Sequence, residues 1–265
     1  MFPASCAQMP DNLPAPDLVL AFERVTKTYG STIAVDAVSL DIARGAFVAL
    51  VGTSGSGKST LLKTINRLVE PSEGRVTIDG ADVAAEPAPE LRRRIGYVFQ
   101  NIGLFPHMTI AENIAIGLRI AGRMAEARID DLLDLVDLPR DIAGRLPDAL
   151  SGGQRQRVGI ARALAPGARL LLLDEAFGAL DPVTRDALGT RIRDLHDRLG
   201  LTTILVTHDM AEALLLADRV LVMKAGRIVA DATPADLVAG KGGDDAQALV
   251  QVPRAQAERL RALVA

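Results

Sequence analysis

The sequence contains a single cysteine, Cys6, among its 265 residues. One thiol cannot form a disulfide within the chain, and it leaves a cysteine-based metal site without its ligands. The chain therefore neither needs nor shows an oxidising compartment. Positive charge is not in excess either, because the formal net charge is −3. Binding to nucleic acid through its phosphates favours the opposite sign, so we expect no nucleic-acid partner.

Long apolar runs are missing as well. A stretch such as 170–173 is far too short to cross a bilayer, which takes about 20 apolar residues. We therefore expect any membrane role to come through a partner. Residues 1–17 contain four prolines and no basic residue. They lack the charged and apolar regions of a signal peptide, and we expect a flexible N-terminal lead-in.

The hydrophobic fraction of 49% is enough to bury the core of one large domain, or of a domain with an inserted lobe. Short apolar segments alternate with helical ones, which favours an α/β sheet with a parallel core. We expect strands within 18–42, at 47–51, 75–78, 97–99, 170–173 and 202–206, and a final strand pair at 219–223 and 227–230. We expect helices at 59–68, 110–120, 125–136 and around Leu188, Ile192, Leu195 and Leu199. An inserted helical lobe is predicted at about 100–155, and a tail at 240–265 that becomes helical from Arg254.

A glycine-rich loop follows the apolar run 47–51 and precedes a predicted helix. Its residues are Gly52, Thr53, Ser54, Gly55, Ser56, Gly57, Lys58 and Ser59, which match the phosphate-binding pattern G-x-x-x-x-G-K-[ST] in full. Backbone N–H groups of such a loop point at phosphate oxygens, and the helix presents its positive N-terminal end to the same anion. Lys58 is expected to reach the β- and γ-phosphates, and Ser59 to ligate Mg²⁺. We predict an ATP-binding loop that extends to Thr60; a glycine-rich turn without a ligand does not explain the complete motif.

A second candidate element is the run 170–173, which leads directly into Asp174 and Glu175. A buried strand that ends in Asp delivers the carboxylate to the carboxyl edge of a parallel sheet, where ligands bind. We predict that Asp174 holds Mg²⁺ there and that Glu175 acts as general base toward the attacking water. The pattern alone also fits a strand that ends at a solvated turn. The complete phosphate loop upstream favours the functional interpretation.

The segment Leu150-Ser151-Gly152-Gly153-Gln154 matches the signature of ABC ATPases, a pattern far more specific than the phosphate loop. Residues 18–231 resemble an ABC nucleotide-binding domain, with the motifs in the right order. The resemblance implies an α/β fold of the P-loop NTPase class, with a RecA-like core, an antiparallel β-subdomain and an inserted α-helical subdomain, over about 18–239. It also implies a head-to-tail homodimer with two ATP molecules between the subunits. Ser151, Gly152, Gly153 and Gln154 then belong to the ATP-binding set, and Ser151 and Gly153 contact the γ-phosphate held by the partner.

Further positions match motifs of this family. Tyr29 matches the aromatic residue that stacks on adenine; a tyrosine in an ordinary strand and turn is the simpler alternative. Gln100 matches the glutamine that senses metal and water and faces the membrane partner, and His208 matches the switch histidine that contacts the γ-phosphate. The resemblance thus implies a catalytic set, Glu175, His208, Gln100 and Lys58, and a Mg²⁺ set, Ser59, Gln100 and Asp174.

The segment Ala179-Leu180-Asp181 matches the family's loop that touches the partner subunit. Asp181, followed by Pro182, is also a good helix N-cap with proline in the first turn. Both interpretations can hold at once. His196 has no placement in the family's motifs, and we expect it on a helix surface.

Residues 94–109 and 174–182 are similar to the ATPases of glycine betaine, carnitine and choline importers, the osmoprotectant uptake systems. The similarity implies transmembrane permease subunits, an indirect solute-binding partner, and a peripheral place on the cytoplasmic face of the inner membrane. Leu104, Phe105 and Met108 are expected either to line a groove for a short permease helix or to be core of the helical lobe. Several osmoprotectant ATPases carry a C-terminal pair of regulatory CBS domains. The sequence up to Ala265 has no room for them, so we do not expect ionic-strength regulation through this subunit.

Other functions remain as alternatives. The ATPase does not touch the solute, so amino-acid or polyamine uptake stays open. A non-transport ABC ATPase for nucleic acid or ribosomes fits less well, because no heptads separate Lys58 from Ser151 and the chain has one cassette. A subunit that binds ATP without hydrolysis is not favoured, since Glu175 and His208 are both present. The segment 100–109 looks more like importers than exporters.

Overall fold

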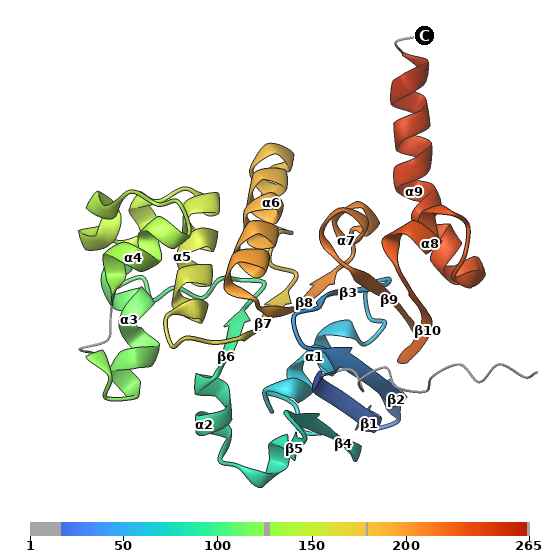
Figure 1. Ribbon diagram of the computed structural model, residues 1–265, viewed down its shortest axis with the longest axis horizontal. Coiled ribbons are helices and arrows are strands. Elements are labelled where there is room, and N and C mark those ends of the chain that lie inside the picture. The colour runs from blue at the N-terminus through green and yellow to red at the C-terminus, as the bar shows by residue number, and fades with distance from the viewer. Residues whose placement is uncertain (1–16, 125–127, 179, 264–265) are drawn as a thin grey trace, which may run out of the picture.

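The fold, a computed structural model, is described for residues 17–124, 128–178 and 180–263. Residues 1–16 of the expected lead-in lie outside this part. Two sheets and the helices around them build the molecule (Figure 1). None of the helices within the described ranges is both long and apolar enough to span a bilayer.

The larger sheet has six strands in the order β10-β9-β3-β8-β7-β6. Its strands are β3 (Phe47–Val51), β6 (Ile95–Val98), β7 (Leu170–Asp174), β8 (Thr202–Thr207), β9 (Arg219–Lys224) and β10 (Arg227–Ala232). All pairings are parallel except that of β9 with β10. Strands β3, β7 and β8 are buried along their whole length, as apolar strands covered on both faces should be. The predicted parallel core and the final strand pair are confirmed.

The smaller sheet is antiparallel, with the order β2-β1-β4-β5. Its strands are β1 (Leu18–Tyr29), β2 (Thr32–Ala43), β4 (Glu73–Ile78) and β5 (Ala81–Asp82). Helix α1 (Lys58–Ile65) lies between the two sheets, because its Leu61, Leu62 and Ile65 share one core with β1, β2 and the six-stranded sheet. This sheet is the antiparallel β-subdomain that the family resemblance implied.

The remaining helices are α2 (Ala88–Arg93), α3 (Ile110–Ile120), α4 (Ile129–Leu135), α5 (Gly152–Leu164), α6 (Pro182–Leu199), α7 (Met210–Leu216), α8 (Pro234–Val238) and α9 (Gly243–Ala262). Short 3₁₀ turns are η1 (Val83–Ala85), η3 (Arg140–Gly144) and η4 (Pro147–Ala149). Helices α5, α6 and α7 belong to the second core, on the opposite face of the six-stranded sheet from α1. Along β3, Phe47, Ala49 and Val51 face this second core, whereas Val48 and Leu50 face α1.

Helices α3, α4 and α5 gather at one end of the molecule, at the left of Figure 1. The expected helix 110–120 matches α3, which begins with a capping box between Thr109 and Glu112. On α4, Leu133 and the adjacent Val136 are buried, and Ile129 and Leu132 pack against the same core, so the predicted apolar face is confirmed. Residues 125–127 of that expected helix lie outside the described part. This group is the inserted α-helical subdomain.

Helix boundaries differ from expectation at α4, which begins at Ile129 because Arg128 is not helical, and at two further helices. Helix α1 ends at Ile65 rather than at residue 68, because Asn66 caps it and Arg67 has a left-handed φ of 54°. Helix α9 begins at Gly243, well before Arg254, and Pro253 lies inside it. Its first turn carries acidic residues, which the helix dipole favours, and Asp245 pairs with Lys224 at 2.6 Å.

The expectation that His196 lies on a helix surface is wrong. The side chain is 3% exposed on α6. Its ring packs at 5.1 Å from that of Phe47, and Nδ1 lies 3.0 Å from Oγ1 of Thr203. Burial lowers the pKa of His196, with the charge of Arg193 as the second cause. His196 therefore belongs to the core and not to a site.

Candidate nucleotide site

The predicted site residues meet at the carboxyl edge of four neighbouring parallel strands. The glycine-rich loop follows β3, Gln100 follows β6, Asp174 ends β7, and His208 follows β8. The order β3-β8-β7-β6 makes these strand ends adjacent, although they are far apart in the sequence. This edge is where open α/β sheets bind ligands.

The glycines of the loop are required by space. A Cβ on Gly57 would lie 2.1 Å from the backbone oxygen of Ala34, and a Cβ on Gly52 would lie 2.1 Å from that of Met223. Gly57 also has a φ of 105° at the start of α1. Only glycine combines this conformation with so close an approach of two backbones. The loop therefore packs between β2 and the end of β9, and these backbone contacts restrict its conformation.

The inner side of the loop carries polar groups that a phosphate would satisfy. Lys58 is buried, and its Nζ donates to the carbonyl oxygens of Gly52 at 2.8 Å and Thr53 at 2.9 Å. Burial lowers the pKa of Lys58, and the charges of Glu175 and Asp174 oppose that shift. Oγ of Ser56 is buried and finds no hydrogen-bond partner among the described residues. A cation and a buried hydroxyl around a backbone cradle fit a phosphate chain.

Asp174 is 4% exposed and holds polar partners on both carboxylate oxygens. Oγ of Ser59 donates to Oδ1 at 2.6 Å. The hydroxyl of Tyr97 donates to Oδ2 at 2.8 Å, and Nζ of Lys63 lies 3.3 Å from the same oxygen. Burial and the charge of Asp174 raise the pKa of Tyr97, so its hydroxyl remains a donor. The Ser59 hydroxyl and a carboxylate oxygen in contact are a donor set that suits Mg²⁺.

Glu175 directly follows Asp174, and two of the predicted catalytic residues lie around its Oε2. Nε2 of Gln100 donates to Oε2 at 3.1 Å, and Nδ1 of His208 lies 3.7 Å from it. Glu175 has a left-handed φ of 48°, which costs a non-glycine residue about 1–2 kcal/mol. Its N–H donates to the oxygen of Val206 on β8 at 3.0 Å and fixes this turn. Strain of this kind is common where a side chain must be aimed for chemistry.

Tyr29 ends β1 and is 51% exposed. Its register partner on β2 is Thr32, two residues before Ala34, whose oxygen lies against Gly57. The hairpin tip that carries Tyr29 is thus held beside the phosphate loop. Nζ of Lys27 lies 5.1 Å from the ring centroid of Tyr29. An exposed ring at the entrance of the cradle leaves a face for a base, as the adenine-stacking prediction requires.

The signature segment begins α5, in the helical subdomain. Ser151 caps the helix: its Oγ accepts from the N–H of Gln154 at 3.3 Å, and Oε1 of Gln154 accepts from the N–H of Ser151 at 2.9 Å. A Cβ on Gly153 would lie 2.4 Å from a methyl of Thr184 on α6. The start of α5 therefore presents backbone N–H groups at a positive helix end, close to the start of α6.

The expected partner-contact loop leads into α6. Asp181 caps this helix, since its Oδ1 accepts from the N–H of Thr184 at 3.0 Å, which confirms the predicted N-cap. Hydrogen bonds from Thr184 lower the pKa of Asp181. Leu180 is buried, whereas Asp181 is exposed. Ala179 lies outside the described residues.

Several residues that the sequence did not single out support these loops. Nη2 of Arg185 donates to the oxygen of Leu180 at 3.0 Å, and its Nε lies 3.6 Å from Oε1 of Glu212 on α7. Oγ1 of Thr207 donates to Oε2 of Glu212 at 2.6 Å. Burial raises the pKa of Glu212. Arg185 thereby links the loop before α6 to the strand end that carries His208. Its position four residues after Asp181, in the first turns of α6, is the only feature of the sequence that pointed toward this loop.

A groove of about 760 Å³ opens on the other side of Asp174, between α2, α3 and α5. Apolar side chains line much of it, including Phe105 and Ile120, which are 41% and 66% exposed. Leu104 packs against the core of the helical lobe, whereas Met108 is partly buried and belongs neither to the groove lining nor to that core. Gln100 and Asp174 both reach this groove. Two of the predicted Mg²⁺ ligands thus lie at the wall of an apolar groove.

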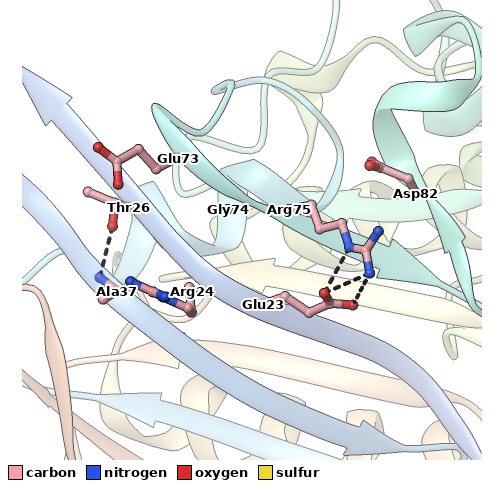
Figure 2. A pocket seen from close by; sticks show the side chains of 8 residues that line it. All are labelled: Glu23, Arg24, Thr26, Ala37, Glu73, Gly74, Arg75 and Asp82. Atoms are coloured by element: carbon pink, nitrogen blue, oxygen red, sulfur yellow. Dashed lines mark hydrogen bonds and ion pairs between the residues drawn. The ribbon is translucent and has the colours of Figure 1, made fainter.

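A second hollow, of about 580 Å³, lies in the antiparallel sheet (Figure 2). Its wall contains an ion pair in which Arg75 meets Glu23 at 2.8 Å. The register of β1 against β4 shifts between Glu23 and Thr26, and Gly74 lies close against the backbone of Arg24. None of the predicted site residues lines this hollow. We attribute it to the irregular pairing of two strands.

The fold and the phosphate cradle define a nucleotide-binding domain of the P-loop class. The family model described as "ABC transporter" matches residues 35–178. The chain therefore belongs to the ABC transporter family. The dimeric ATP-binding cassette MJ0796, solved in a post-hydrolysis state bound to ADP and Pi, is 35% identical, with a TM-score of 0.72 over 81% of this chain and 98% of that one.

Two curated relatives are ATP-binding proteins of solute transport systems. The carnitine transport ATP-binding protein OpuCA of Listeria monocytogenes is 50% identical over 224 residues, 83% of this chain and 56% of that protein. The glycine betaine uptake system ATP-binding protein YehX of Escherichia coli is 46% identical over 230 residues, 85% of this chain and 74% of that protein. The chain spans little more than half the length of the first of these relatives.

Proposed function

We propose that this chain is the ATP-hydrolysing subunit of an ABC importer that takes up a quaternary-ammonium osmoprotectant. One observation carries the ATPase assignment: the cradle, Asp174, Glu175, Gln100 and His208 converge at one sheet edge, with Gln100 and His208 both beside Oε2 of Glu175. The substrate class rests on the relatives that transport carnitine and glycine betaine.

ATP binds with its phosphates in the cradle of residues 52–60. Lys58 exchanges its two carbonyl partners for phosphate oxygens, which gives the ammonium charged acceptors in place of neutral ones. Ser56 supplies the buried hydroxyl, and Tyr29 stacks on the base. The protein's part in catalysis is positioning and charge stabilisation, as is general for phosphoryl transfer.

Ser59 and Asp174 would hold Mg²⁺, with Gln100 beside them; the ion supplies positive charge to the phosphate oxygens. Glu175 accepts a proton from the attacking water. His208, close to Glu175, contacts the γ-phosphate. The left-handed turn at Glu175 accompanies the placement of its carboxylate between Gln100 and His208.

The working unit is a head-to-tail homodimer. The start of α5 offers Ser151, Gly153 and a positive helix end, which would complete the anion site of the partner's cradle. Leu180 and Asp181 lie beside this segment: a Cβ on Gly152 would meet Leu180 at 3.8 Å. Two ATP molecules close the dimer, and phosphate release reopens it.

The groove between α2, α3 and α5 would receive a short helix of a permease subunit. Its mixture of exposed apolar side chains and arginines suits an amphipathic helix. The ATPase then works at the cytoplasmic face of the inner membrane through this contact, and a solute-binding protein delivers the solute to the permease. Closure of the dimer moves the two permease subunits into a new access state.

Uptake of labelled glycine betaine and choline tests the proposal, in cells with and without this subunit, at high and low osmolarity. We expect uptake to disappear on deletion and to return with wild type but not with Glu175→Gln. Unchanged uptake, with no redundant system present, would remove the substrate class. Labelled amino acids and polyamines, assayed in the same strains, then test the second candidate function.

A further inference from the structure

Tyr97 lies where the metal carboxylate and the groove meet. It belongs to β6, where its register partner on β7 is Leu172. Successive side chains of a strand alternate between faces, so Leu172 and Asp174 share one face of β7 with Tyr97 beside them. The phenol therefore extends toward the residue two positions after its register partner and donates to Oδ2 of Asp174 at 2.8 Å.

The two oxygens of Asp174 have different partners. Oδ1 accepts from Ser59, the other expected metal ligand, at 2.6 Å. Oδ2 accepts from Tyr97 and lies 3.3 Å from Nζ of Lys63. A carboxylate held at Oδ2 cannot rotate freely about its Cβ–Cγ bond. Oδ1 is thereby kept on the side of Ser59 and the cradle.

We propose that Tyr97 is a positioning residue, whose hydroxyl holds Asp174 so that Oδ1 faces the Mg²⁺ of the nucleotide complex. This inference rests on the proposed function, because it assumes that Ser59 and Asp174 hold the metal. Partners that orient a metal-binding carboxylate contribute strongly to metal affinity. Lys63 contacts the same oxygen, but its cation also offsets the charge that attracts the metal. Tyr97 is neutral and only orients.

The same side chain faces the groove. The rings of Tyr97 and Phe99 lie 4.5 Å apart, and both residues line the groove with Gln100. Phe99 is 44% exposed there. Tyr97 thus lines the groove with its ring and, through its neutral hydroxyl, contacts Oδ2 of Asp174.

The test uses the full chain with Glu175→Gln, so that ATP is not consumed. The dissociation constant of ATP is measured by calorimetry with excess Mg²⁺ and again with EDTA, and the ratio gives the metal-dependent gain in affinity. Tyr97→Phe keeps the ring against Phe99 and removes only the hydroxyl. We expect it to lower the metal-dependent gain about 10-fold or more, while the affinity in EDTA stays within about twofold.

Thr203→Val is the matched control, because it removes a different buried hydroxyl of the same sheet, one that contacts His196 on α6. It should leave the metal-dependent gain unchanged. Equal losses with and without Mg²⁺ in Tyr97→Phe would show a merely structural role and overturn the inference, as would an unchanged gain. If the Glu175→Gln parent itself gains nothing from Mg²⁺, the metal site of the proposed function fails, and this inference fails with it for that separate reason.

Discussion

Gln100 donates from Nε2 to Oε2 of Glu175 across a distance of 3.1 Å, and so it joins the segment that follows β6 to the residue after β7. His208 approaches the same oxygen from β8, at 3.7 Å. The proposed base therefore has a neighbour at each adjacent strand end, and Gln100 is the one that donates a hydrogen bond to it. For hydrolysis, Oε2 must accept a proton from water in this position, so Gln100 and the water share one acceptor.

Gln100→Ala is predicted to leave ATP binding intact and to lower the rate of hydrolysis about 10- to 100-fold, because Glu175 loses a neighbour that sets its orientation. Steady-state phosphate release and ATP binding by calorimetry measure the two effects. Lys241→Met is the control, because Lys241 is exposed, pairs with Asp236 and is not one of the predicted site residues. A variant at Gln100 that hydrolyses ATP at the wild-type rate would mean that the contact with Glu175 is incidental.

Lys58→Ala should weaken ATP binding at least about tenfold, since a hydrogen bond to a charged group contributes about 1.5–3 kcal/mol. The variant also removes the ammonium that donates to the carbonyls of Gly52 and Thr53. Calorimetric titration with ATP and Mg²⁺ is the measurement, after the variant is shown to be folded by a cooperative unfolding transition in urea. Unchanged affinity in a folded variant would sink the assignment of the cradle.

Gly57→Ala tests whether the cradle is held by backbone contact. Its new Cβ would lie 2.1 Å from the oxygen of Ala34, so overpacking adds to the strained φ of 105°. We expect a loss of at least about 3 kcal/mol in the free energy of unfolding. Gly200→Ala is the control: it has a φ of 59° with open space around the new atom, so strain alone should cost about 1–2 kcal/mol. Equal losses in the two variants would show that β2 does not confine the loop.

His196 should make stability depend on pH. Burial lowers its pKa in the fold, whereas the unfolded chain keeps the ordinary value of about 6.5. Between these two values the unfolded chain binds the extra proton, so the free energy of unfolding falls as the pH drops below about 6.5 and levels off below the folded pKa. His196→Gln should remove this part of the slope in urea titrations from pH 7.5 to pH 5. An unchanged slope in the variant would assign the acid sensitivity to other groups.

The sequence was sufficient for the parts of the fold that depend on local pattern. Unbroken apolar runs located β3 and β7, because strands covered on both faces need no alternation. The cradle motif and the pair Asp174-Glu175 lie at strand ends, and the strand order brings them together. The assignment of roles to Gln100, His208 and the start of α5 required the family resemblance, since a lone polar residue after a strand has no pattern of its own.

The contacts of Tyr97 and Lys63 with Asp174 could not be predicted, because they depend on the register of β6 against β7 and on the rotation of α1. His196 is different. It lies four positions after Ile192, on the apolar face that Leu188, Ile192 and Leu195 already defined, so helical period alone predicts its burial. The start of α9 was missed because Pro253 resembles a helix start, whereas Ala246 and Val250 before it are buried.

The role of Glu175 is tested most directly by Glu175→Gln, which keeps the size of the side chain and one acceptor oxygen but removes the negative charge. We predict that it binds ATP with Mg²⁺ as wild type does, hydrolyses it at least about 100-fold more slowly, and elutes with ATP at twice the 28.0 kDa mass of one chain. Multiple-turnover phosphate release at saturating ATP is the decisive measurement. A wild-type rate in this variant would contradict the account, because the residue at the centre of the site would then not be the base.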